Sequence, residues 1–154
     1  AYIRLGRSGV PVLYSDEQAE KIQIGKATQL REGSDVTIIA TGILVADAMA
    51  AAEALATEGI SARVLDMHTI KPIDAEAVIK AAKETGAIVT AEEHSVIGGL
   101  GSAVAEVVVQ NAPCRIEMVG QKDTFGESGK PAELLEKYGM TASDIADAVK
   151  KVLK

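Results

Sequence analysis

Acidic residues and histidines follow two short β-branched runs of this chain. Asp66 and His68 come at the end of one run, and Glu92, Glu93 and His94 come at the end of another. Two histidines and three carboxylates at one sheet edge could bind a metal ion or transfer protons. However, no pair has the i, i+4 spacing of helical zinc ligands. We therefore expect these acids to cap helices or to meet basic groups of a partner.

A glycine-rich turn, Gly98-Gly99-Leu100-Gly101, separates a predicted strand from a predicted helix. Backbone amides at such a turn can bind a phosphate on the helix N-terminus. However, Val104 stands where a dinucleotide fingerprint has its third Gly or Ala. We expect the glycines to let the helix pack closely on its strand. A free-standing α/β module that binds a nucleotide or another anion at this turn is the alternative.

Nucleophilic motifs are missing from the sequence. It contains neither the Gly-x-Ser-x-Gly elbow of serine hydrolases nor a P-loop, and the run Gly126-Glu127-Ser128-Gly129-Lys130-Pro131 is expected to be a loop that leads into a helix. Cys114 is the single cysteine, so an internal disulfide is excluded. We expect it to be a small core residue of a protein from a reducing, cytoplasmic compartment.

Composition excludes several classes of function. The net charge of −6 argues against a nucleic-acid surface, and an aromatic content of 3% leaves few platforms for stacking bases. No apolar run approaches the roughly 18 residues of a membrane span. A chain of 154 residues with 47% hydrophobic residues fits a single globular domain with an aliphatic core.

Strand and helix patterns alternate along the chain. They predict strands at 36–40, 62–66, 87–91 and 115–119, and helices that begin near Leu44, Asp74, Leu100, Pro131 and Thr141. Residues 21–30 predict an antiparallel edge strand or ribbon, and Ile145, Val149, Val152 and Leu153 are predicted to face inward from the last helix. Such alternation implies right-handed parallel crossovers. The predicted fold class is α/β: a three-layer α/β/α sandwich, with a mostly parallel sheet of about five strands including one antiparallel strand.

The predicted sheet brings polar residues from several strands to one edge. In open α/β sheets, ligands bind outside the carboxyl ends of the strands. This rule places Thr41 and Gly42, residues 66–68 and residues 92–101 on one edge of the sheet.

Three longer segments together resemble the C-terminal domain of transketolases. They are residues 64–74, 90–104 and 128–135, and the resemblance covers residues 1 to about 152. Deoxyxylulose-phosphate synthase and the beta subunit of 2-oxo acid dehydrogenases share this fold and stay as alternatives. The runs His68-Thr69-Ile70-Lys71-Pro72 and Ser128-Gly129-Lys130-Pro131 look closer to the transketolase pattern.

The resemblance implies an enzyme that uses thiamine diphosphate and a divalent metal, Mg²⁺ or Ca²⁺, to move a two-carbon ketol unit between sugar phosphates. It places the cofactor ligands and the catalytic carboxylate in upstream pyrophosphate- and pyrimidine-binding domains, on the same chain or on a separate subunit. This chain would then carry no catalytic, cofactor or metal residue. We expect it to support a homodimer, to be inactive alone and to bind no cofactor alone.

The resemblance also assigns one substrate-binding residue. The run Tyr2-Ile3-Arg4-Leu5-Gly6-Arg7 is similar to the end of the pyrimidine-binding domain, which places the arginine that binds the substrate phosphate at Arg7. A guanidinium can bind phosphate through two hydrogen bonds, and an exposed linker arginine is the alternative. Residues 1–15 are accordingly expected to be the end of a preceding domain with a linker, and residues 16–154 the C-terminal domain.

Overall fold

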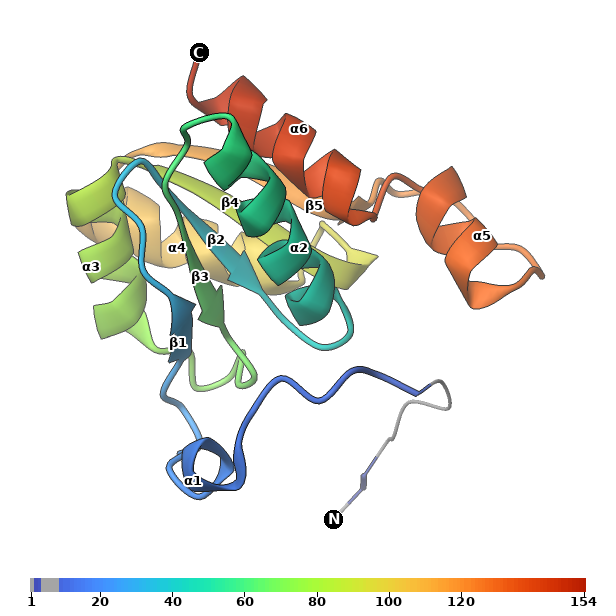
Figure 1. Cartoon of the computed structure of the whole chain (residues 1–154), viewed down its shortest axis with the longest axis horizontal. Helices are drawn as coiled ribbons and strands as arrows, with labels where there is room; N and C mark the ends of the chain where they lie inside the picture. Colours follow the sequence, from blue (N-terminus) through green and yellow to red (C-terminus); the bar gives the residue numbers. More distant parts are fainter. Residues whose placement is uncertain (1, 4–8) are drawn as a thin grey trace.

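A five-stranded sheet forms the middle layer of the computed structural model, which describes residues 2–3 and 9–154 (Figure 1). The strands are β1 (Thr28–Arg31), β2 (Val36–Ala40), β3 (Ala62–Asp66), β4 (Ala87–Ser95) and β5 (Arg115–Gln121). The helices are α1 (Asp16–Ala19), α2 (Leu44–Thr57), α3 (Ala75–Thr85), α4 (Leu100–Asn111), α5 (Pro131–Lys137) and α6 (Ala142–Val152). The strand order is β1-β3-β2-β4-β5, in which β1 is antiparallel to β3 and the other neighbours are parallel. The predicted fold class is confirmed.

Helices cover both faces of the sheet. α2 and α6 pack on one face over a core that includes Leu44, Leu55 and Ile145. α3 and α4 pack on the other face, where Val78 and Val104 are buried. Because both faces are covered, β2 and β3 are buried along their whole length.

Local sequence signals located most elements. The predicted bounds of β2 and β3 are confirmed, Pro131 opens α5, and the capping box of Thr141 and Asp144 opens α6. β4 and β5 run longer than predicted because they stay paired as far as Ser95 opposite Gln121. Among the described helices, none is both long and apolar enough to cross a bilayer.

The prediction for residues 21–30 is wrong at its beginning, because β1 starts at Thr28. Thr28 lies opposite Asp66, the last residue of β3, so earlier residues have no strand with which to pair. Ile24 is accordingly 87% exposed. Leu153 is also wrongly predicted: it is the C-cap residue of α6 and is exposed. The four-residue helix α1 was not predicted.

Candidate functional site

The carboxyl ends of β2, β3 and β4 meet at one edge of the sheet, as predicted, and two cavities lie there. The first cavity, of about 340 Å³, is lined by residues that include Thr41, Gly42, Glu92, Glu93, His94 and Gly99. The second, of about 370 Å³, shares Thr41 and Gly42 and adds Tyr14, Asp66 and His68. The predicted polar residues therefore share one edge but divide into two groups.

The first cavity lies where the chain changes direction across the sheet. β2 leads through α2, on one face, to β3, whereas β4 leads through α4, on the other face, to β5. The crevice between two such strands is where ligands bind in open α/β sheets. A phosphate or cofactor site in this domain would be expected at this position.

The carboxylate of Glu92 occupies the helix N-terminus at this crevice. Its Oε2 accepts a hydrogen bond from the backbone N–H of Leu100 at 2.7 Å, and its Oε1 accepts one from the N–H of Gly101 at 2.9 Å. The side chain is only 2% exposed. Glu92 thus supplies the negative charge that the N-terminus of α4 favours, in the place where a phosphate would bind.

The glycines of the turn are required by close packing. A Cβ atom on Gly99 would lie 2.1 Å from Oε2 of Glu92. One on Gly101 would lie 2.8 Å from the sulfur of Met118 and 2.9 Å from Oγ1 of Thr90. The expectation that these glycines let the helix approach its strands is confirmed. The N–H groups of Leu100 and Gly101 already bind Glu92, which argues against the alternative anion site at this turn.

His94 and Glu93 do not complete an acid–base pair with Glu92. The side chain of His94 is 65% exposed, and its Nδ1 lies 4.0 Å from Oε2 of Glu92. Nδ1 instead lies 2.9 Å from the carbonyl oxygen of Ser95, to which it can donate a hydrogen bond. Glu93 is exposed. Within residues 2–3 and 9–154, no three His, Cys, Asp or Glu side chains are grouped so that they could hold a metal ion.

Tyr14 and Asp66 form the main polar contact of the second cavity. The hydroxyl of Tyr14 donates a hydrogen bond of 2.5 Å to Oδ2 of Asp66, a residue that is 8% exposed. Burial raises the pKa of Tyr14, and the hydrogen bond to Asp66 raises it further. Oδ1 of Asp66 and Nε2 of His68 are buried without a hydrogen-bond partner. Sequence reasoning identified Asp66 and His68 but missed Tyr14, because no local signal links residues 52 positions apart.

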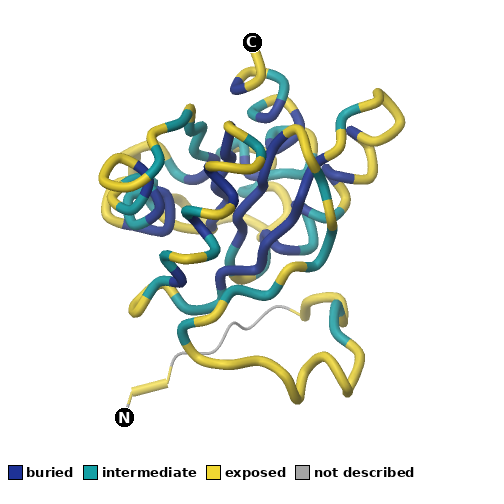
Figure 2. The backbone as a smooth tube through the Cα atoms, turned by 90° about the vertical axis from the view of Figure 1, so that its left-hand side faces the viewer, coloured by how far each residue is buried: buried dark blue, intermediate teal, exposed yellow. Residues whose placement is uncertain are grey.

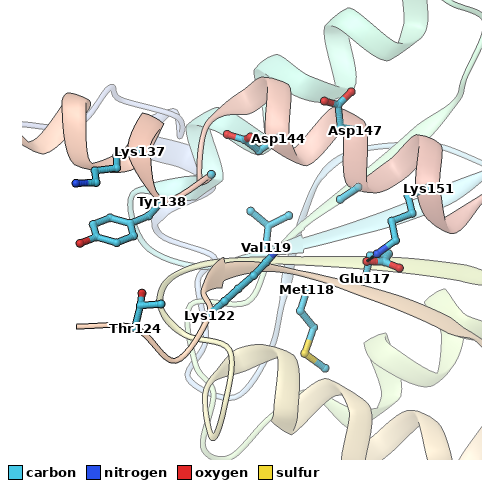
Figure 3. A pocket seen from close by; sticks show the side chains of 12 residues that line it. Glu117, Met118, Val119, Lys122, Thr124, Lys137, Tyr138, Asp144, Asp147 and Lys151 are labelled. Atoms are coloured by element: carbon cyan, nitrogen blue, oxygen red, sulfur yellow. Dashed lines mark hydrogen bonds and ion pairs between the residues drawn. The ribbon is translucent and has the colours of Figure 1, made fainter. Parts of the chain in front are cut away.

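A third cavity, of about 380 Å³, lies between β5, α5 and α6 (Figure 3). Lys151 pairs there with Glu117 at 2.9 Å, and Asp144 is held by the N-cap residue of α6. Its other charged lining includes Lys122 and Asp147. Charges of both signs therefore line this cavity. No sequence motif marks it.

Three further predictions from the sequence concern Cys114, the run from Gly126 and Arg7. Cys114 is half-buried and packs against the core beneath α3 and α4, where burial raises the pKa of its thiol. The run from Gly126 is a loop that leads into α5, as predicted. Arg7 lies outside the described residues, so its assignment stays a prediction.

Thiamine diphosphate and its metal do not fit the part of the chain that the structure describes. A pyrophosphate needs free backbone amides or cations, and the amides of Leu100 and Gly101 at the crevice are bonded to Glu92. A divalent metal needs several oxygen ligands that converge on one point, and such a group does not occur among these residues. No chemical step is therefore assigned to this cofactor within the domain.

Fold and site together define a three-layer α/β/α domain in which Glu92 caps the N-terminus of α4 at the carboxyl edge of the sheet. The sequence matches the family "Transketolase, C-terminal domain" over residues 25–145. The chain therefore belongs to the transketolase C-terminal domain family, and the resemblance seen in the sequence is confirmed.

The chain is similar to proteins named as transketolases and as 1-deoxy-D-xylulose-5-phosphate synthases. The chain is 53% identical, over 98% of its length and 46% of the relative, to the 6-deoxy-6-sulfo-D-fructose transketolase subunit SqwH of Clostridium sp. strain MSTE9. It is 42% identical to the 1-deoxy-D-xylulose-5-phosphate synthase of Heliobacterium modesticaldum, over 89% of the chain and 21% of that protein. A solved structure titled "Split gene transketolase, inactive beta4 tetramer" matches with a TM-score of 0.93 and 56% identity, over 99% of this chain and 49% of the other. The chain thus spans about half the length of its transketolase relatives.

Proposed function

We propose that this chain is the C-terminal domain of a split-gene transketolase subunit, and that the assembled enzyme moves a two-carbon ketol unit between sugar phosphates. The observation that carries the proposal is the TM-score of 0.93, at 56% identity, with a structure titled as a split gene transketolase. The proposal is tested by assaying ketol transfer in the complete subunit together with its partner. A cytoplasmic location is part of the proposal and is supported by the single cysteine.

The cofactor and its metal belong, in this proposal, to the pyrophosphate- and pyrimidine-binding domains. The closed N-terminus of α4 supports this division, because Glu92 takes the amides that a pyrophosphate would use. The domain is then mainly structural, and residues 1–15 are the end of the preceding domain with its linker.

We also propose that copies of the subunit associate through the outer face of α4. α4 carries Glu106 as its single charged residue, and Val109 on it is 69% exposed. Ile97, just before the helix, is 65% exposed. A groove of about 530 Å³ runs between α4 and residues 70–73. Exposed apolar side chains such as those of Val109 and Ile97 favour burial against a second copy.

Arg7 is the proposed ligand of the substrate phosphate. Arg7→Ala in the complete subunit should lower kcat/KM for phosphorylated substrates by about tenfold to a hundredfold, because a hydrogen bond to a charged group contributes about 1.5–3 kcal/mol. An unphosphorylated donor should be nearly unaffected. Arg7→Lys should retain only part of the activity, because an ammonium keeps the positive charge but cannot form the two parallel hydrogen bonds of a guanidinium. Equal losses for both donors would assign Arg7 to the fold instead.

A 1-deoxy-D-xylulose-5-phosphate synthase domain is the second candidate, supported by 42% identity to the Heliobacterium enzyme. The two candidates differ in their product. Formation of 1-deoxy-D-xylulose 5-phosphate by the assembled protein, without ketol transfer between sugar phosphates, would favour the synthase.

A further inference from the structure

The chain between residues 9 and 15, here called the strap, lies along the carboxyl edge of the sheet (Figure 1). Most of it is exposed, and Figure 2 shows the segment before β1 mainly in the exposed colour. Leu13 and Tyr14 are the two strap residues with intermediate burial. The docking of the strap therefore depends on these two side chains.

The two side chains hold the strap in different ways. Leu13 packs against the core beneath α2 and α6, which is an apolar contact with little directional preference. Tyr14 makes a directional contact, because its hydroxyl donates a hydrogen bond to Oδ2 of Asp66 at 2.5 Å. Hydrogen bonds to ionised acceptors are roughly twice as strong as those between neutral groups.

Asp66 is placed for this contact by the sheet. It is the last residue of β3 and lies opposite Thr28 of β1. Its Oδ1 is buried and unpaired, so the Tyr14 hydroxyl is the one hydrogen-bond donor that its side chain has within the described residues. Loss of that hydroxyl leaves a buried carboxylate without a partner, which is unfavourable unless the strap lifts and water enters.

The Tyr14 contact shortens the free chain that precedes the domain. The next polar contacts with the rest of the domain toward β1 are the ion pair of Lys26 with Glu76 and the hydrogen bond from the Ala27 N–H to Asp74. With Tyr14 docked, the seven residues back to Arg7 span at most about 25 Å. If the strap is anchored first at Lys26, the 19 residues back to Arg7 span up to about 65 Å.

We propose that Tyr14 and Asp66 are a positioning pair, which docks the strap on the sheet edge and thereby limits how far the preceding residues, Arg7 included, can extend from this domain. The role of Arg7 within this inference rests on the proposed function; the docking itself does not. In this inference the pair acts through the strap and not as a catalytic group.

Limited proteolysis tests the docking. Chymotrypsin cleaves after Tyr and Phe, so Tyr14→Phe removes the hydroxyl but keeps the cleavage site. Cleavage after residue 14, followed by mass spectrometry, should be roughly ten- to a hundredfold faster in the variant, because cleavage reports the population of opened strap. Asp66→Asn keeps an acceptor oxygen and should give an intermediate rate. Tyr138→Phe is the matched control, because Tyr138 bonds the carbonyl of Phe125 far from the strap. Equal cleavage in the wild type and in Tyr14→Phe would overturn the proposal.

Kinetics of the complete enzyme test the positioning. Tyr14→Phe should raise KM for phosphorylated substrates several-fold while leaving kcat nearly unchanged, whereas a purely structural defect would lower the active fraction and hence kcat. Faster cleavage with an unchanged KM, in an enzyme where Arg7→Ala does raise KM, would overturn the positioning role. If Arg7→Ala has no effect, the proposed role of Arg7 fails, and the cleavage rates still decide whether the pair docks the strap.

Discussion

Replacing Glu92 by glutamine should destabilise the domain strongly, because the carboxylate is buried and both its oxygens are used. The glutamine side chain would keep one acceptor oxygen and would turn an NH₂ group toward a backbone N–H, so one hydrogen bond is lost and two donors face each other. Hydrogen bonds to charged groups contribute about 1.5–3 kcal/mol, and an unpaired buried donor costs about 1–3 kcal/mol. We expect a loss of about 2–4 kcal/mol, a large part of the roughly 5–15 kcal/mol typical of a domain.

Urea denaturation measures this loss. Glu92→Gln should lower the midpoint by about 1–2 M with little change in the m-value. Glu93→Gln is the matched control, since Glu93 is the exposed neighbour and makes no hydrogen bond within the described residues. That control should stay within about 0.5 kcal/mol of the wild type. If Glu92→Gln behaves like the control, Glu92 does not cap α4.

Anion rescue distinguishes capping from general packing. Glu92→Ala leaves the N–H groups of Leu100 and Gly101 free, at the positive end of the helix. Phosphate or formate should then raise the melting temperature of this variant, because an anion that binds the folded state stabilises it. The wild type should gain much less. Equal stabilisation of both proteins would refute the idea that Glu92 fills an anion site.

Three further outcomes follow from the structure. Gly101→Ala should lower the free energy of unfolding by about 1–3 kcal/mol in urea denaturation, because the new Cβ would crowd Met118. Gly126→Ala should leave the stability unchanged, because a Cβ there meets no other atom of the described residues. The pKa of Tyr14 is raised in the folded state, so its stabilising effect is complete below the ordinary pKa of about 10 and declines as pH rises toward the folded value. Stability measured above about pH 10 should therefore fall more steeply in the wild type than in Tyr14→Phe. Val109→Asp should weaken self-association in sedimentation experiments, and an unchanged association constant would exclude the outer face of α4.

Local patterns predicted most of the fold. β2 and β3 were located because short β-branched runs lie between turn residues, and α6 because Thr141 and Asp144 form a capping box. The start of β1 was missed because strand length depends on the partner strand, which ends at Asp66. The alternation of side chains within residues 21–30 does not show where the partner strand ends.

The site was predictable in position but not in detail. Strand ends and glycines indicated the edge where Glu92 lies. The pairing of Glu92 with amides eight and nine residues away depends on how α4 sits on the sheet. The contact of Tyr14 with Asp66 spans 52 residues and arises from the path of the strap. Contacts of this kind follow from tertiary packing and leave no periodic signal in the sequence.

The most direct test of the proposed function is a two-carbon transfer assay, with a ketose phosphate donor and an aldose phosphate acceptor in the presence of thiamine diphosphate and Mg²⁺. The complete subunit assembled with its partner and this chain alone are compared at equal concentration. We expect transfer by the assembled protein and none by the chain alone. Transfer by the chain alone, or none by the assembled protein, would contradict the assignment of this chain as the supporting C-terminal domain of a transketolase.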